Sequence, residues 1–214
     1  MLYNKIKARQ IAEFLLEIKA VILRPEQPFK WASGWLSPIY CDNRLILSEP
    51  PVRTFIKIAW ASALKDLFPE ANAVAGVATA GIAHAALIAD ELDMPMAYIR
   101  SKPKEHGTEK LLEGRLLPTH QTVVIEDLVS TGKSSLVAAQ SIISEGIPVL
   151  GLMSIFSYGF AEAEKAFKDA EISFYSLCDY DTLIELAIAK GYVKHEDLEE
   201  LKAWRQNPGE WRRG

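Results

Sequence analysis

The feature of this sequence that most constrains its fold is a short apolar run that ends at two adjacent carboxylates. Residues 123–125 are β-branched and apolar, which predicts a buried strand that stops at Glu126 and Asp127. A turn of small residues follows at 130–132, and apolar residues resume with helical spacing from Leu136. The turn therefore lies where a strand passes into a helix, which is where open α/β sheets bind their ligands.

The residue types of this turn suit a ligand that carries both a phosphate and hydroxyl groups. A helix N-terminus with free N–H groups favours a phosphate, and the small residues here allow close approach: Ser130, Thr131, Gly132 and Ser134. Glu126 and Asp127 would repel a phosphate, but carboxylates suit sugar hydroxyls or Mg²⁺. A phosphorylated ribose meets both requirements. A P-loop is excluded, because its first glycine would fall at Asp127.

Composition limits the class of protein. A chain of 214 residues, 49% of them hydrophobic, can form one domain with an ample core. The net charge of −4 argues against a dedicated nucleic-acid binder. Cys41 and Cys178 are isolated, so neither a zinc site nor a disulfide framework is expected. The sequence shows neither a signal peptide nor an apolar run of transmembrane length, so we expect a soluble, cytoplasmic protein.

Two acidic residues after a hydrophobic strand, followed by a Thr-Gly turn into a helix, resemble the phosphoribosyl pyrophosphate (PRPP) signature of type I phosphoribosyltransferases. The resemblance implies that Glu126 and Asp127 hold the ribose hydroxyls and that residues 130–134 cradle the 5′-phosphate. The PRPP contacts implied in this segment are Glu126, Asp127, Leu128, Val129, Ser130, Thr131, Gly132, Lys133 and Ser134. The alternative is an ordinary strand-to-helix turn in which the two acidic residues have no role in binding.

Residues 29–44 follow an amphipathic helix predicted over 4–22, and they predict two short strands around a Ser33-Gly34 turn. Together with the segments 37–40 and 42–44, this turn resembles the N-terminal substrate region of orotate phosphoribosyltransferases. The segment is expected to form a hood over the site. Core packing is the expected role of most of its aromatic rings, namely Phe29, Trp31 and Trp35.

The same resemblance implies which residues contact orotate: Tyr40, Arg44 and the backbone of Ser130. The planar guanidinium of Arg44 suits a carboxylate on the base, and a surface ion pair is its alternative role. Two positions depart from other members of the family, which have a lysine in place of Ala32 and an aromatic residue in place of Cys41.

A second strand, glycine turn and helix is predicted over 73–92. Its turn consists of Thr79, Ala80 and Gly81, and it would lie beside the turn at 130–134 if the two strands are neighbours. The resemblance implies that backbone amides here contact the pyrophosphate of PRPP. Many members have a lysine in place of Ala80, so the backbone and Thr79 would provide the contacts in this chain.

A strand predicted over 96–99 leads into a stretch rich in cations: Arg100, Lys102, Lys104, His106 and Lys110. Solvated surface charge is the ordinary explanation, but such a concentration in an acidic protein would also attract an anion. The stretch resembles the catalytic loop of orotate phosphoribosyltransferases, which reaches into the neighbouring subunit's site. The catalytic residues implied are Arg100, Lys102, Lys104, His106 and Asp127, with Arg100, Lys104 and His106 on PRPP.

Further strands are predicted over 149–156 and 172–177, and a helix start at Ser48. We therefore predict an α/β chain with the type I phosphoribosyltransferase fold, in which a mostly parallel, five-stranded sheet is flanked by helices. One domain over 1–214 would comprise a hood of N-terminal helix and β-flap (1–48), an α/β core (49–178) and C-terminal helices (179–214). Trp204 is expected to pack inside the monomer.

The resemblance implies transfer of a phosphoribosyl group from PRPP to orotate, giving orotidine 5′-monophosphate and pyrophosphate in pyrimidine (UMP) biosynthesis. Mg²⁺ would be held through PRPP, with Asp127 as the one candidate protein ligand, and the chain would be a homodimer that binds neither nucleic acid nor membrane. Two alternatives stay open: a phosphoribosyltransferase for another nucleobase, and a non-catalytic, PRPP-sensing regulator that binds nucleic acid.

Overall fold

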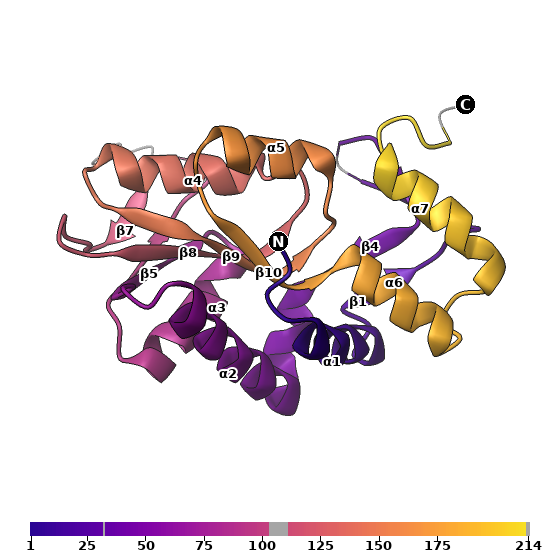
Figure 1. Cartoon of the computed structure of the whole chain (residues 1–214), viewed down its shortest axis with the longest axis horizontal. Coiled ribbons are helices and arrows are strands. Elements are labelled where there is room, and N and C mark those ends of the chain that lie inside the picture. Colours follow the sequence, from indigo (N-terminus) through magenta and orange to yellow (C-terminus); the bar gives the residue numbers. More distant parts are fainter. Residues whose placement is uncertain (32, 103–110, 213–214) are drawn as a thin grey trace.

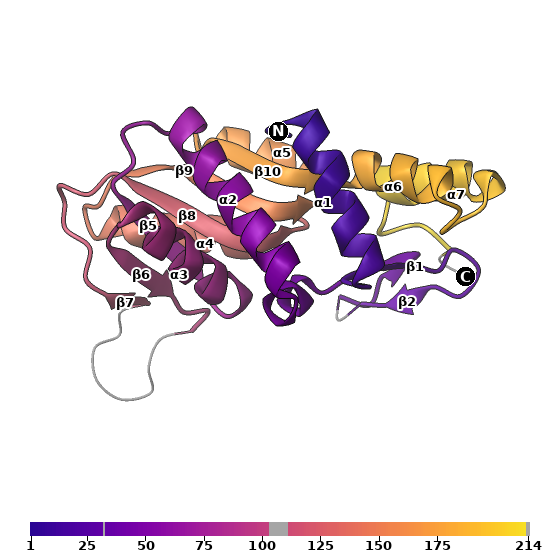
Figure 2. The same ribbon diagram turned by 90° about the horizontal axis from the view of Figure 1, so that it is seen from below.

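The computed structural model describes residues 1–31, 33–102 and 111–212 and centres on a twisted sheet (Figures 1 and 2). Among these residues the sheet has six strands in the order β10-β9-β8-β5-β6-β7. All neighbours are parallel except β7, which runs antiparallel to β6. The strands are β5 (Ala73–Val77), β6 (Met96–Ile99), β7 (Leu112–Gly114), β8 (Thr122–Val129), β9 (Val149–Ser157) and β10 (Phe174–Asp179).

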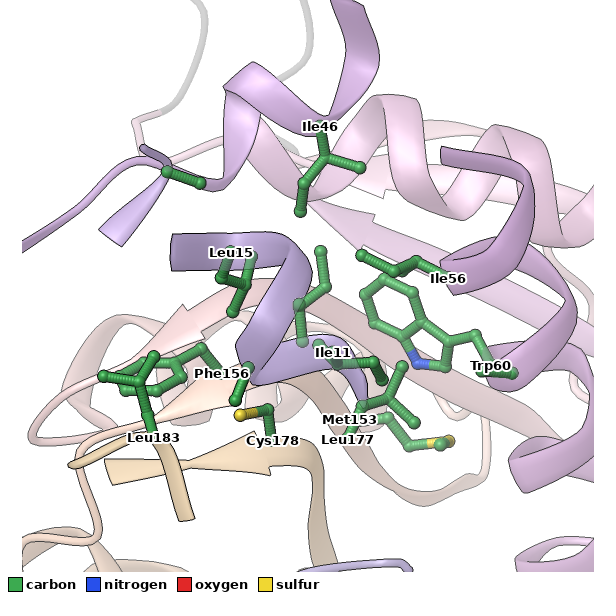
Figure 3. Packing of buried hydrophobic residues seen from close by; sticks show 14 of the residues in the cluster. Ile11, Leu15, Ile46, Ile56, Trp60, Met153, Phe156, Leu177, Cys178 and Leu183 are labelled. Atoms are coloured by element: carbon green, nitrogen blue, oxygen red, sulfur yellow. The ribbon is translucent and has the colours of Figure 1, made fainter. Parts of the chain in front are cut away.

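Helices cover both faces of this sheet, as Figure 1 shows. One face carries α1 (Lys5–Glu17), α2 (Pro50–Leu67) and α3 (Ala80–Leu92), and the other carries α4 (Lys133–Ser144) and α5 (Ala161–Asp169). In Figure 3, Ile11 of α1 and Trp60 of α2 lie against Met153 of β9 within the larger buried cluster. No helix among the described residues is long and apolar enough to cross a membrane.

The hood lies at one end of the molecule, together with the C-terminal helices (Figures 1 and 2). It contains two antiparallel pairs, β1 with β4 and β2 with β3, followed by a 3₁₀ helix, η1. The bounds are β1 (Val21–Leu23), β2 (Phe29–Lys30), β3 (Leu36–Ser37), β4 (Ile39–Cys41) and η1 (Asn43–Ser48). The C-terminal elements are α6 (Tyr180–Ala189), η2 (His195–Asp197) and α7 (Leu198–Gln206).

The predicted α/β class and the mostly parallel sheet are confirmed, and three local expectations are wrong. The sheet has a sixth strand, β7, which the sequence did not indicate because it is only 3 residues long. The first helix ends at Glu17, where Lys19 adopts a left-handed φ of 58°, and Val21 begins a strand instead. The cap of α2 is Glu49 and not Ser48.

Two glycines bring the start of α3 against the sheet. A Cβ at Gly76 of β5 would lie 2.9 Å from Gly81 O and from Ile82 Cα. A Cβ at Gly81 would lie 2.6 Å from the carbonyl oxygen of Ile125 in β8. Since these neighbours are backbone atoms, they cannot move aside as a flexible side chain would. The turn before α3 therefore lies directly beside the part of β8 that carries the carboxylates.

Replacing Gly76 by alanine should destabilise the fold. The new methyl group would overlap the backbone of α3, and overpacking of this kind costs about 1–3 kcal/mol. Urea denaturation should show this loss for Gly76→Ala. The matched control is Gly209→Ala, because a Cβ there meets only side-chain atoms of Trp35 at an ordinary 3.5 Å. Equal stability of the two variants would contradict the close approach.

Candidate functional site

The sequence had indicated that the strand stops at the two acidic residues, and this is wrong: both lie within β8. The strand continues to Val129 because its ladder with β9 extends past the carboxylates, pairing Glu126 with Ser154 and Val129 with Ser157. Glu126 is 7% exposed, and its carboxylate accepts hydrogen bonds from the Ser135 hydroxyl at 3.2 Å and from the Asp127 N–H at 3.1 Å. The regular strand therefore fixes the position of both carboxyl groups.

Burial changes the protonation of this pair. Loss of solvation, followed by the adjacent charge of Asp127, raises the pKa of Glu126 well above its usual value. Burial also raises the pKa of Asp127. A carboxyl pair that retains a proton more readily can both accept and donate hydrogen bonds, which suits contact with the hydroxyl groups of a sugar.

The turn after β8 ends in a helix N-terminus that suits a phosphate. Gly132 adopts a φ of 77° and precedes α4, so the first N–H groups of this helix are not covered by a capping side chain. Ser130 and Thr131 are half-buried, and Ser134 is exposed. The ammonium of Lys133 pairs instead with Glu162 of α5 at 3.0 Å. The backbone and the hydroxyl groups thus form the anion-binding part of this turn.

The second predicted turn lies beside the first, as expected for neighbouring strands. β5 pairs directly with β8, and Thr79, Ala80 and Gly81 lie at the start of α3 after a cis peptide bond between Ala78 and Thr79. Gly81 approaches the backbone next to Glu126. Two helix N-termini and two carboxylates therefore meet at one edge of the sheet.

The cationic stretch begins at the same edge. Arg100 follows β6, the neighbour of β5, and its guanidinium lies 3.6 Å from Glu113 of β7. Lys102 is exposed. Lys104 and His106 lie outside the described residues, so their predicted roles stay predictions.

The hood, the end of β8 and the turn after β9 line a cavity of about 480 Å³, a volume in the range of small-molecule sites. Its walls are mostly aromatic or apolar, and the residues that line it are Phe29, Lys30, Trp31, Ser33, Tyr40, Cys41, Leu128, Ser130 and Tyr158. Tyr40 and Ser130, both predicted to contact the base, are thus brought together. Leu128 lies on the same strand as Glu126 and Asp127, and Ser130 directly follows that strand, so this cavity adjoins the carboxylates.

Arg44 does not line this cavity. Its side chain is 63% exposed and donates to both carboxylate oxygens of Asp42, at 2.6 and 2.7 Å. This is the ion-pair arrangement that the sequence left open as an alternative. Among the described residues that line the cavity, the one cation is Lys30. Sequence reasoning missed Lys30 and Tyr158: the density of aromatic residues around position 30 could have indicated the first, whereas nothing local indicates the second.

The raised pKa values predict a dependence of stability on pH. The folded chain retains protons on these carboxyls above about 4.5, the ordinary pKa of glutamate, so stability should fall as pH rises towards the raised values. Glu126→Gln removes one such group and keeps an oxygen for Ser135. From about pH 5 to about pH 8 the wild type should lose stability that the variant keeps. We therefore expect the difference in unfolding free energy, variant minus wild type, to increase by about 1 kcal/mol or more over this range.

Urea denaturation across this pH range measures the difference. Glu70→Gln, at an exposed position before β5, is the control, and its difference from the wild type should stay constant. A Glu126→Gln difference that is equally constant would contradict the effect of burial.

Comparison with known proteins agrees with this geometry, although no family model matches the chain. Orotate phosphoribosyltransferase of Bacillus subtilis (strain 168) is 53% identical over 205 residues, which are 96% of this chain and 95% of that protein. The protein of the same name from Listeria innocua is 51% identical over 203 residues, 95% of this chain and 97% of that one.

Solved structures share the architecture. Orotate phosphoribosyltransferase from Aeropyrum pernix superposes with a TM-score of 0.73 at 25% identity, covering 86% of this chain and 99% of that one. UMP synthase from Leishmania donovani has a TM-score of 0.77 at 22% identity, covering 92% of this chain and 42% of that one. The first relatives are similar over nearly the full chain. This chain shares the type I phosphoribosyltransferase fold with the solved structures. This chain belongs to the orotate phosphoribosyltransferase family.

Proposed function

We propose that this chain transfers the 5-phosphoribosyl group from PRPP to orotate and releases pyrophosphate, in pyrimidine (UMP) biosynthesis. The observation that carries the proposal is the continuity of β8: Glu126 and Asp127 lie on the same strand as Leu128, and Ser130 follows directly. Leu128 and Ser130 line the cavity under the hood. A sugar held by the carboxylates would therefore present its anomeric carbon near a planar ring in the cavity.

Each part of the site has a task in this reaction. A ring nitrogen of orotate bonds to the anomeric carbon and releases its proton to solvent, while the bond from that carbon to the pyrophosphate oxygen breaks and its electron pair leaves with the pyrophosphate. Positive charge develops on the sugar and negative charge on the leaving group, so donors at the start of α3 and the cations from Arg100 onward stabilise the transition state. Orotate is already anionic, so positioning and charge stabilisation contribute more than a strong general base.

Mg²⁺ is part of the proposal. Among the described residues no cluster of three or more metal-ligating side chains occurs, but Glu126 and Asp127 offer carboxylate oxygens at the site. This donor set fits an ion that is held mainly by substrate, since Mg²⁺ in such sites takes one or two carboxylates together with phosphate oxygens. When bound, the ion would neutralise negative charge on the pyrophosphate. Asp127 is the residue that would hold it.

We also propose that the protein is a cytoplasmic homodimer whose residues 100–110 act at the site of the partner subunit. The support is the resemblance of that cationic stretch to the family's catalytic loop. The closing of such a loop would keep water from the sugar cation, and transfer to a base instead of hydrolysis requires this.

The loop lysine provides the first test of function. Removing one well-placed donor to the leaving group typically costs about 3 kcal/mol, so Lys104→Ala should lower turnover by about a hundredfold or more. A spectrophotometric assay of orotate consumption with PRPP and Mg²⁺ measures this. Lys5→Ala, at an exposed position that begins α1, should leave turnover unchanged. A wild-type protein that binds PRPP without consuming orotate would overturn the base assignment and direct the assay to other bases and to nucleic acid.

A matched pair of variants tests which cation recognises the carboxylate of orotate. Lys30 lines the cavity, whereas Arg44 already pairs with Asp42. A hydrogen bond to a charged group contributes about 1.5–3 kcal/mol, so Lys30→Gln should raise the KM for orotate about tenfold or more. Its KM for PRPP should change little, and Arg44→Gln should change neither by more than about twofold. The opposite order would assign the carboxylate to Arg44, as the family resemblance implies.

A further inference from the structure

The C-terminal helix α7 packs against residues that line the base cavity on the hood and on the turn after β9. Trp204 of α7 is 0% exposed. Its ring centroid lies 5.7 Å from that of Trp31 and 5.7 Å from that of Tyr158, in edge-to-face geometry at 84° and 78°. Trp31 and Tyr158 both line the cavity, on the hood and on the turn after β9 respectively. The rings of Trp31 and Tyr158 also contact each other, with centroids 5.1 Å apart, so the buried Trp204 ring packs against a pair of lining residues that are themselves in contact.

Hydrogen bonds from adjacent residues of α7 hold the same two walls. The indole N–H of Trp204 donates to the carbonyl oxygen of Leu36 at 3.0 Å. Leu36 lies in β3, opposite Lys30 of β2. The next residue, Arg205, donates to the carbonyl oxygen of Gly159 at 2.9 Å and pairs with Asp181 at 2.8 Å. Gly159 directly follows Tyr158, so each wall has its own bond to the helix.

The hood hairpin needs such support. β2 and β3 each contain 2 residues, and an isolated two-stranded hairpin is at best marginally stable. The helix itself is well anchored, because Leu201 is 0% exposed and its carbonyl oxygen accepts from the Tyr180 hydroxyl at 3.0 Å. A fixed helix that bonds to a weak hairpin can determine where that hairpin lies.

We propose that Trp204 and Arg205 are positioning residues that hold the hood hairpin and the turn after β9 in place and thereby set the affinity for the base. The identity of the base as orotate rests on the proposed function, whereas the arrangement of the walls does not. Neither side chain lines the base cavity, so both act through Trp31, Leu36 and Tyr158. The alternative is that α7 only adds buried surface to the fold.

The test separates these roles by comparing two buried tryptophans. Trp204→Phe keeps a ring in the cluster and removes the donor to Leu36. The control, Trp60→Phe, changes an indole that is 1% exposed, packs against His84, and has no hydrogen-bond partner for its N–H among the described residues. Thermal denaturation, kcat and the KM values for orotate and PRPP are measured for each. We expect Trp204→Phe to raise the KM for orotate about fivefold or more, because the loss of one hydrogen bond typically costs about 1 kcal/mol. The KM for PRPP should rise less than twofold.

Trp60→Phe should lower the melting temperature without changing the ratio of the two KM values. If Trp204→Phe behaves in the same way, the helix is only structural and the proposal fails. Arg205→Gln is the second variant, since Arg205 is only half-buried and its loss should not prevent folding. It should raise the KM for orotate selectively as well, and unchanged kinetics in Arg205→Gln would overturn its role. Absence of orotate turnover in the wild type would instead refute the proposed function, so the two failures are distinguishable.

Discussion

The close approach of α3 to β8 is the constraint on which the site depends. Because Gly76 and Gly81 lack side chains, the first turn of α3 rests against β5 and against the backbone of Ile125. The order of strands reverses between β5 and β8, so the helices that follow them cover opposite faces of the sheet (Figure 1). The two helix N-termini then converge on one edge, with Glu126 between them. A larger residue at either glycine would separate the parts of the anion site.

The same edge carries an electrostatic cost. Two adjacent carboxyl groups are buried there, and burial raises the pKa of both. A chain that only needed to fold would gain by exposing or replacing them. Hydrogen bonds to the Glu126 carboxylate from the Ser135 hydroxyl and the Asp127 N–H compensate in part. Asn43 of the hood fixes the backbone beside them, because it donates to the carbonyl oxygen of Asp127 at 2.7 Å. The carboxyl pair is thus held in a defined position before any ligand binds, and this is the arrangement that electrostatic catalysis requires.

The sequence predicted the parts of the fold and site that local patterns determine. β5 and β8, their turns and the helices after them have strong apolar periodicity, and each was found within one or two residues of its predicted bounds, apart from the extension of β8 through Glu126 and Asp127. The errors have non-local causes. β7 becomes a strand only because it pairs with β6. The pairing of Arg44 with Asp42, two residues away, is by contrast a local arrangement that the sequence left open as an alternative. Tyr158 reaches the cavity through the path of β9, which no local pattern encodes.

The site therefore combines two kinds of structure with different origins of order. Its sugar and phosphate part lies on long strands and helix starts that the central sheet makes rigid. Its base part lies on a hood whose paired strands contain 2 or 3 residues each, too few to define a shape alone. The aromatic cluster around Trp204 provides the missing constraint, because Phe160 and Tyr180 contact the same ring that packs against Trp31 and Tyr158. Selection of the base would then depend on residues at both ends of the chain, while the chemistry of PRPP depends on the middle.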